Sequence, residues 1–230
     1  MDAYTHLLLT TSPLDLAEAT GPTERGSVGV FQGQLQAADN WCWAAAAASV
    51  HATHLAASGG QSAPPTQCGI VDANLVGVGR ACKDNAPGTA CATVKEPGSR
   101  LSCVNEEMDR EGFLHLALRK LDLLEGYVVL GAGGSLSVPG VLSATGLPLV
   151  VSDALDFDEL VALVDSRRMV CLRIARGDYR HFVIVYGYEA FPDNDLLIWN
   201  PAAGPEVVDF EGFWREFGPF THKIITRPLQ

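Results

Sequence analysis

The stretch QAADNWCWAAAAASVHATHLAA, residues 36–57, predicts the element around which the rest of the fold is arranged. From residue 42 onward it is dominated by alanine, the strongest helix former, and Gly59 and Gly60 end the pattern. We therefore expect one helix over residues 42–57. The successive alanines at 44–48 leave no bulky side chain on any face, which suits close approach of neighbouring elements. The sequence predicts that this helix is central and buried.

A cysteine stands where the loop becomes this helix. Cys42 would lie at the positive end of the helix dipole, which favours a thiolate. A nucleophilic thiolate also needs a base, and the base needs a group that orients it. His181 begins the strand pattern HFVIVYGY, and Asn200 ends the next one, LLIWN. Adjacent strands could bring these two side chains together, so Cys42, His181 and Asn200 are the candidate catalytic residues.

A glutamine in front of the helix is a candidate for binding an oxyanion. Gln36 precedes Cys42 closely enough for its side-chain amide to act together with the Cys42 backbone N–H. Gln32 and Gln34 compete for this role, and spacing alone favours Gln36.

Each catalytic candidate also has a structural alternative. Cys42 could be an inert packed thiol, and His181 could lie in a surface turn. Asn200 could simply open a turn before Pro201, in which case Asp178 is the alternative orienting group.

The patterns along the chain predict an α+β fold of two lobes. Helical patterns dominate the first half of the chain, from about residue 31 to residue 126. They include an amphipathic stretch at 106–124, which should pack on the first helix. Short strands dominate about 127–230, at 127–130, 147–151, 170–175, 182–188, 196–199 and 223–226. We expect the strands at 170–175, 182–188 and 196–199 to pair antiparallel. Helices are expected at 157–168, capped by Asp156, and near 210–217. Residues 1–30 predict an extended arm before one domain at 31–230.

Composition and charge narrow the possible functions. Hydrophobic residues make up 47% of the 230-residue chain and charged residues 19%, a balance that supports a sizeable core. The net charge of −11 repels phosphate backbones and anionic lipids, so we expect no nucleic-acid partner. No apolar run is long enough to span a membrane, and the N-terminus lacks the basic start of a secretory signal. We expect a cytoplasmic protein, or one exported without a Sec-type signal peptide, that has no membrane partner.

The other cysteines and a histidine pair predict structural roles. Four cysteines follow the first helix in a loop-rich stretch: Cys68, Cys82, Cys91 and Cys103. Because they form no CxxC pair, we expect two disulfides in an oxidising compartment and no zinc. Cys171 lies in an apolar strand and should be in the core. His51 and His54 lack the HExxH spacing and an accompanying acid, so we expect no metal there and no cofactor elsewhere.

Four features follow one another along the chain: Gln36, the stretch WCWAA, a later strand led by His181, and the pair Asn200-Pro201. In this order they resemble the papain-like cysteine peptidases, and more closely the compact bacterial branch of that family. The Cys-to-His separation lies within, and the Cys-to-Asn separation just beyond, the roughly 130–150 residues typical of papain-type enzymes. The resemblance covers residues 36–201. The Cys-Gly-x-Cys lead-in of papain itself is absent.

This resemblance implies a helical lobe followed by an antiparallel β-barrel-like lobe. It also implies that Cys42 is the nucleophile, His181 the acid and base, Asn200 the orienting residue and Gln36 the oxyanion donor. We expect hydrolysis of neutral or basic polypeptides. The alternatives are an acyltransferase or deamidase that uses the same thiol, or a noncatalytic binding module that retains the fold. A transglutaminase-like fold ranks lower, because its Cys-to-His separation is usually much shorter.

Overall fold

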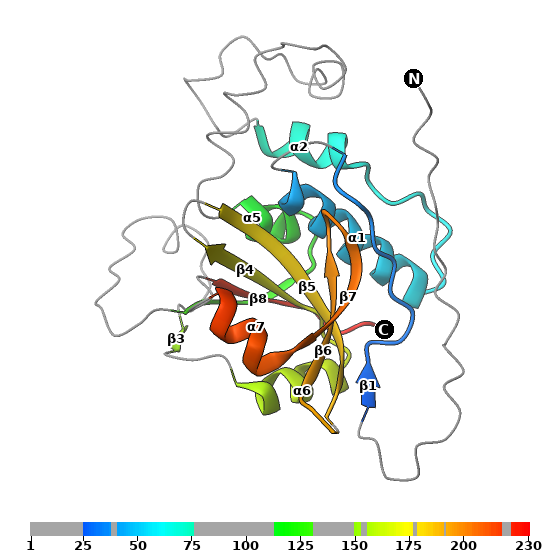
Figure 1. Ribbon diagram of the computed structural model, residues 1–230. Coiled ribbons are helices and arrows are strands. Elements are labelled where there is room, and N and C mark those ends of the chain that lie inside the picture. Colours follow the sequence, from blue (N-terminus) through cyan, green and yellow to red (C-terminus); the bar gives the residue numbers. More distant parts are fainter. Residues whose placement is uncertain are drawn as a thin grey trace, which may run out of the picture.

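The computed structural model describes residues 25–37, 41–75, 113–130, 150–152, 156–176, 179–190, 192–217 and 222–230 (Figure 1). The helices are α1 (Cys42–Ala57), α2 (Gln67–Leu75), α5 (Phe113–Lys120), α6 (Phe157–Asp165) and α7 (Phe210–Phe217). Figure 1 shows α1, α2 and α5 gathered in the upper part of the view, and α6 and α7 in the lower part. Together with the sheet described next, these helices confirm the predicted α+β class. Within these ranges no helix is long and apolar enough to cross a membrane.

One sheet runs between the two groups of helices. Its strands are β1 (Arg25–Ser27), β2 (Leu124–Leu130), β3 (Val150–Ser152), β4 (Val170–Arg176), β5 (Tyr179–Glu189), β6 (Asp195–Asn200), β7 (Gly204–Asp209) and β8 (His222–Thr226). The order is β3-β2-β8-β4-β5-β6-β7, and β1 pairs with β5 off this path. The strands β4, β5 and β6 pair antiparallel, as expected. β7 and β8 also pair antiparallel with their neighbours, whereas β2 and β3 are parallel. In the described part of the chain this sheet is an open path that ends at β3 and β7.

The helix α1 has the predicted bounds and the predicted central place. All of its residues from Cys42 to Val50 are buried, and α2, α5 and β5 all pack against it. Alanine permits this, since a single methyl group lets a neighbouring backbone come close on every side. The buried hydroxyls of Ser49 and Thr53 donate to carbonyl oxygens one turn earlier, at 2.7 and 2.8 Å, so burial leaves neither donor unpaired.

The amphipathic helix expected at 106–124 ends earlier than predicted. Residues 106–112 lie outside the described residues, and α5 stops at Lys120. Asp122 then adopts a left-handed φ of 59°, a conformation that commonly terminates a helix, and Leu124 already begins β2. The leucine spacing continues across this stop, which is why the predicted end was wrong. As expected, α5 packs on α1.

The bounds of two other elements also differ from the sequence patterns. Asp156 caps α6, its carboxylate accepting the N–H of Asp158 at 3.0 Å, but the helix ends at Asp165 rather than at 168. Sequence patterns predict no strand at 204–209, yet β7 forms there. Its start, Gly204-Pro205, signals a turn, and an edge strand tolerates proline because one side needs no ladder hydrogen bonds.

Candidate active site

The predicted pair of His181 and Asn200 is brought together by neighbouring strands. β5 and β6 pair antiparallel, and His181 Nε2 lies 2.7 Å from Asn200 Oδ1. His181 is the third residue of β5 and only 4% exposed. This burial rules out the alternative of a histidine in a surface turn. The other orienting candidate, Asp178, lies outside the described residues.

The amide of Asn200 is held in one orientation by three contacts. Its Oδ1 faces His181 and also accepts the backbone N–H of Ala202 at 2.9 Å, while its Nδ2 donates to Glu206 Oε1 at 2.9 Å. A carboxylate only accepts hydrogen bonds, so Nδ2 must face Glu206 and Oδ1 must face His181. His181 therefore donates from Nε2, and Nδ1 is the ring nitrogen left to act as a base.

The hairpin between β6 and β7 makes this geometry possible. The turn at 201–203 reverses the chain, and Asn200 pairs with Gly204. Gly204 has a φ of 105°, a region that L side chains rarely adopt. The tight turn places Ala202 and Glu206 on either side of the Asn200 amide.

Opposing effects set the pKa of His181. Burial lowers this pKa below the ordinary value by penalising the imidazolium form. The hydrogen bond to Asn200 and the negative charge of Glu206 raise it, and the net direction is downward. A neutral imidazole at this position can accept a proton from a neighbouring thiol.

Cys42 is the first residue of α1 and is 6% exposed. Trp41 occupies the N-cap position and gives no side-chain hydrogen bond to the first turn, which also contains no acidic residue. The positive end of the helix dipole is therefore not offset by an acid within that turn, an arrangement that favours negative charge at the first residue of the helix. The helix packs against β5, the strand that carries His181, and Cys42 forms no disulfide.

The segment 31–37 runs antiparallel along α1. The N–H of Gln32 donates to Thr53 Oγ1 at 2.9 Å, and the N–H of Gln34 donates to Ser49 Oγ at 2.8 Å. Each step toward residue 37 therefore moves toward the N-terminus of α1. Of the three glutamines, Gln36 is the one nearest the start of the helix in this register, and Gln32 and Gln34 lie beside its later turns.

Gln36 is also tied to the hairpin that carries Asn200. Its backbone N–H donates to the carbonyl oxygen of Pro201 at 2.8 Å. Its side-chain Oε1 is buried and has no hydrogen-bond partner among the described residues. Gln36 thus lies between the start of α1 and the Asn200 turn, where an oxyanion donor would be needed.

Gln67, at the start of α2, holds both neighbours of Gln36. Its Nε2 donates to the carbonyl oxygen of Leu35 at 2.7 Å, and its Oε1 accepts the N–H of Ala37 at 2.9 Å. No role for Gln67 follows from the sequence, because its contacts join residues far apart in the chain.

Removing this clamp should impair catalysis more than stability. We expect Gln67→Ala to lower kcat/KM for any reaction that depends on Cys42 by about 10- to 100-fold, because small displacements of a positioned group are costly. Gln61→Ala, an exposed glutamine in the loop before α2, is the matched control. Steady-state kinetics and thermal unfolding check this expectation. A destabilised Gln67→Ala variant with unchanged kcat/KM would contradict it.

Asn200→Ala should cost less activity than removal of Cys42 or His181, because the thiolate and imidazolium can form without the amide but are held less well. We expect a loss below the roughly 10²- to 10⁴-fold attributable to general acid–base catalysis. Double-mutant kinetics should show strong coupling between Asn200 and His181. Asn194→Ala, in an exposed turn, is the control. Additive effects, or a larger loss from Asp178→Ala, would move the orienting role elsewhere.

The remaining cysteines fall into two groups. Cys171 is fully buried in β4, as expected, and burial raises the pKa of its thiol to about 12. Cys68 is disulfide-bonded, in agreement with the disulfide expectation for this cysteine. The other three cysteines of that expectation, Cys82, Cys91 and Cys103, lie outside the described residues.

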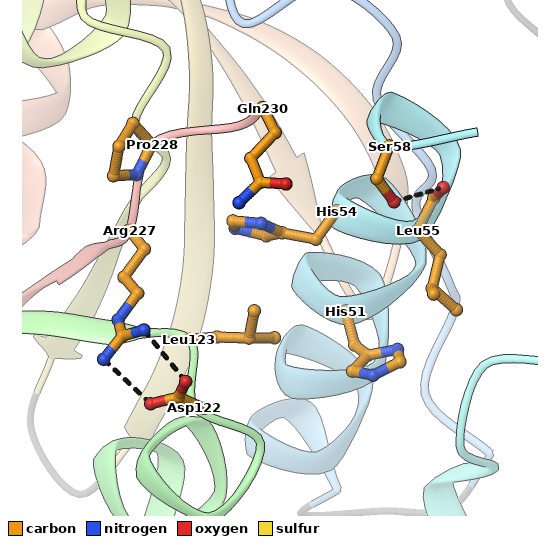
Figure 2. A pocket seen from close by; sticks show the side chains of 9 residues that line it. All are labelled: His51, His54, Leu55, Ser58, Asp122, Leu123, Arg227, Pro228 and Gln230. Carbon is orange, nitrogen blue, oxygen red and sulfur yellow. Dashed lines mark hydrogen bonds and ion pairs between the residues drawn. The ribbon is translucent and has the colours of Figure 1, made fainter. Parts of the chain in front are cut away.

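A pocket of about 270 Å³ lies at the other end of α1 (Figure 2). His51, His54, Asp122, Arg227 and Gln230 line it, and Arg227 pairs with Asp122 through two contacts of 2.8 and 2.9 Å. Burial lowers the pKa of both histidines. Within the described ranges no group of three or more His, Cys, Asp or Glu could hold a metal ion. The histidines lie about 14–18 Å along the helix from Cys42, so this pocket is separate from the candidate active site.

No protein-family model matches this sequence, and no curated protein is similar to it. The assignment of chemistry therefore depends on the geometry of the site itself. A buried imidazole whose Nε2 is bonded to an amide oxygen and a cysteine at a helix N-terminus are groups that nucleophilic acyl chemistry uses.

Proposed function

We propose that this protein is a cysteine peptidase of papain-like architecture. The observation that carries the proposal is the 2.7 Å contact between His181 Nε2 and Asn200 Oδ1. The contact from Asn200 to Glu206 fixes the Asn200 amide so that its oxygen accepts from His181 Nε2. Nδ1 is then the ring nitrogen that would take the thiol proton, as a Cys-His-Asn site requires. We also propose that α1, α2 and α5 form the helical lobe, and that the strands form the β-barrel-like lobe.

The proposed reaction begins with transfer of the Cys42 thiol proton to His181 Nδ1. The thiolate, stabilised by the N-terminus of α1, attacks the carbonyl carbon of a peptide bond. The negative charge on the carbonyl oxygen is stabilised by the Cys42 backbone N–H and the side-chain amide of Gln36. His181 then protonates the leaving amine, and water, deprotonated by His181, releases the acyl group from Cys42.

The test compares the wild type with Cys42→Ala on a peptide library derived from a proteome. Mass spectrometry reads both new peptide termini and changes in side-chain mass. New termini that depend on Cys42 are expected. Cys171→Ala, which removes a buried thiol from β4, is the matched control and should retain cleavage.

Other outcomes would replace the proposal. Side-chain modification without new termini would indicate the acyltransferase or deamidase alternative, since the acyl-enzyme is shared and only the acceptor or the scissile amide differs. Neither product, with a Cys42 thiol no more reactive than an ordinary one, would indicate a noncatalytic binding module.

A further inference from the structure

The strand β7 places a charged residue where an apolar one is expected. Gly204, Glu206 and Val208 point to the protected face of this strand, because its exposure alternates with period two. Val207 points the other way and is 62% exposed. If packing alone determined this strand, Val207 would face the protein interior and Glu206 would face solvent. Packing therefore does not explain Glu206.

The register of the hairpin explains which residue Glu206 meets. Glu206 lies opposite Ile198 on β6, and Asn200 is two residues further along the same face. The two side chains are diagonal neighbours, and Asn200 Nδ2 donates to Glu206 Oε1 at 2.9 Å. The carboxylate thus begins a chain of hydrogen bonds that runs through the Asn200 amide to Nε2 of His181.

We propose that Glu206 is a positioning residue of this site, which orients the Asn200 amide toward His181 and stabilises the imidazolium form through its charge. The catalytic meaning of this inference rests on the proposed function. The hydrogen bonds of Glu206, Asn200 and His181 are independent of that function. Ala202 also holds the Asn200 Oδ1, so the orientation is shared between two anchors, whereas the charge comes from Glu206. In agreement, the carboxylate of Glu206 raises the pKa of His181 against the effect of burial.

Two substitutions separate the hydrogen bond from the charge. Glu206→Gln keeps an oxygen that can accept from Asn200 Nδ2 and removes the charge, while Glu206→Ala removes both. Glu211→Gln removes an equal charge from an exposed site in the first turn of α7 and is the matched control. All three are made in the full chain, with and without Cys42→Ala, because without the thiol the imidazole of His181 titrates alone.

The measurement is ¹⁵N NMR of the His181 ring across pH, which needs no substrate. Without Glu206 the imidazolium is less stable, so its titration should move to lower pH, by at least about half a unit in both Glu206 variants and not in Glu211→Gln. The Nε2–H tautomer should persist in Glu206→Gln and be less populated in Glu206→Ala. With Cys42 present, the alkaline limb of the pH profile for Cys42 alkylation should move in the same direction.

The outcomes distinguish this inference from the proposed function. An unchanged His181 titration in both Glu206 variants would overturn the inference, as would equal shifts in Glu206→Gln and Glu211→Gln. A lower unfolding temperature with no shift in titration would show that Glu206 only stabilises the hairpin. If the wild type cleaves no peptide but the Glu206 variants shift His181 as expected, the peptidase proposal fails and the positioning role stands.

Discussion

In limiting iodoacetamide at about pH 6, Cys42 is expected to react well ahead of Cys171, and replacing His181 with alanine should slow its modification by about two orders of magnitude. An ordinary thiol with a pKa near 8.5 is only about 0.3% thiolate at that pH, whereas a thiol paired with an imidazolium is largely ionised. Cys171 is buried in β4, and burial raises the pKa of its thiol to about 12. Peptide mapping by mass spectrometry measures the rate at each site.

The control for this experiment is His54→Ala, which removes a partly buried histidine from the same helix as Cys42 but at its other end. Its labelling rate at Cys42 should match that of the wild type. Preferential labelling of any other cysteine, or equal rates in the wild type and His181→Ala, would remove the basis for an ion pair between Cys42 and His181.

Ala46→Leu is expected to destabilise the protein by about 1–3 kcal/mol, because overpacking forces side chains or backbone to shift. Ala46 is fully buried in α1, where two helices and a strand approach the same helix. Ala56→Leu, at an exposed position of α1, makes the same chemical change and should alter the free energy of unfolding by less than about 0.5 kcal/mol. Urea denaturation measures both. Equal small effects would mean that α1 is not tightly enclosed.

The local elements of this fold are predictable because their signals are local. The alanine run and the glycines after it define α1 at both ends, and Asp156 marks the start of α6. The pairing of His181 with Asn200 also follows from the sequence, since each lies in a strong strand pattern and the two strands are consecutive. These predictions depend on spacing and propensity, which the sequence displays directly.

The contacts that complete the site are not predictable in this way. Glu206 lies in a strand whose start resembles a turn, and its role depends on the diagonal register of a hairpin. Gln67 acts on the backbone of residues 35 and 37 from another helix. In both cases tertiary packing determines which residue the side chain contacts, and the periodic pattern of apolar residues in the sequence carries no information about that contact. The end of α5 at Lys120, two residues before the left-handed Asp122, is missed because leucines continue at helical spacing beyond it.

The clamping of segment 31–37 also bears on the order in which parts of the protein fold. This segment is held by α1 and by Gln67 of α2, which both lie in the first third of the chain, and by the turn after Asn200, which lies near its end. The contact between Gln36 and Pro201 joins residues far apart in the chain, so forming it requires the closure of a long loop, which costs conformational entropy. A chain emerging from the ribosome therefore contains Cys42 and segment 31–37 long before it contains the hairpin of β6 and β7. Segment 31–37 can reach its final position only after Pro201, near the end of the chain, has been made and the hairpin of β6 and β7 has folded.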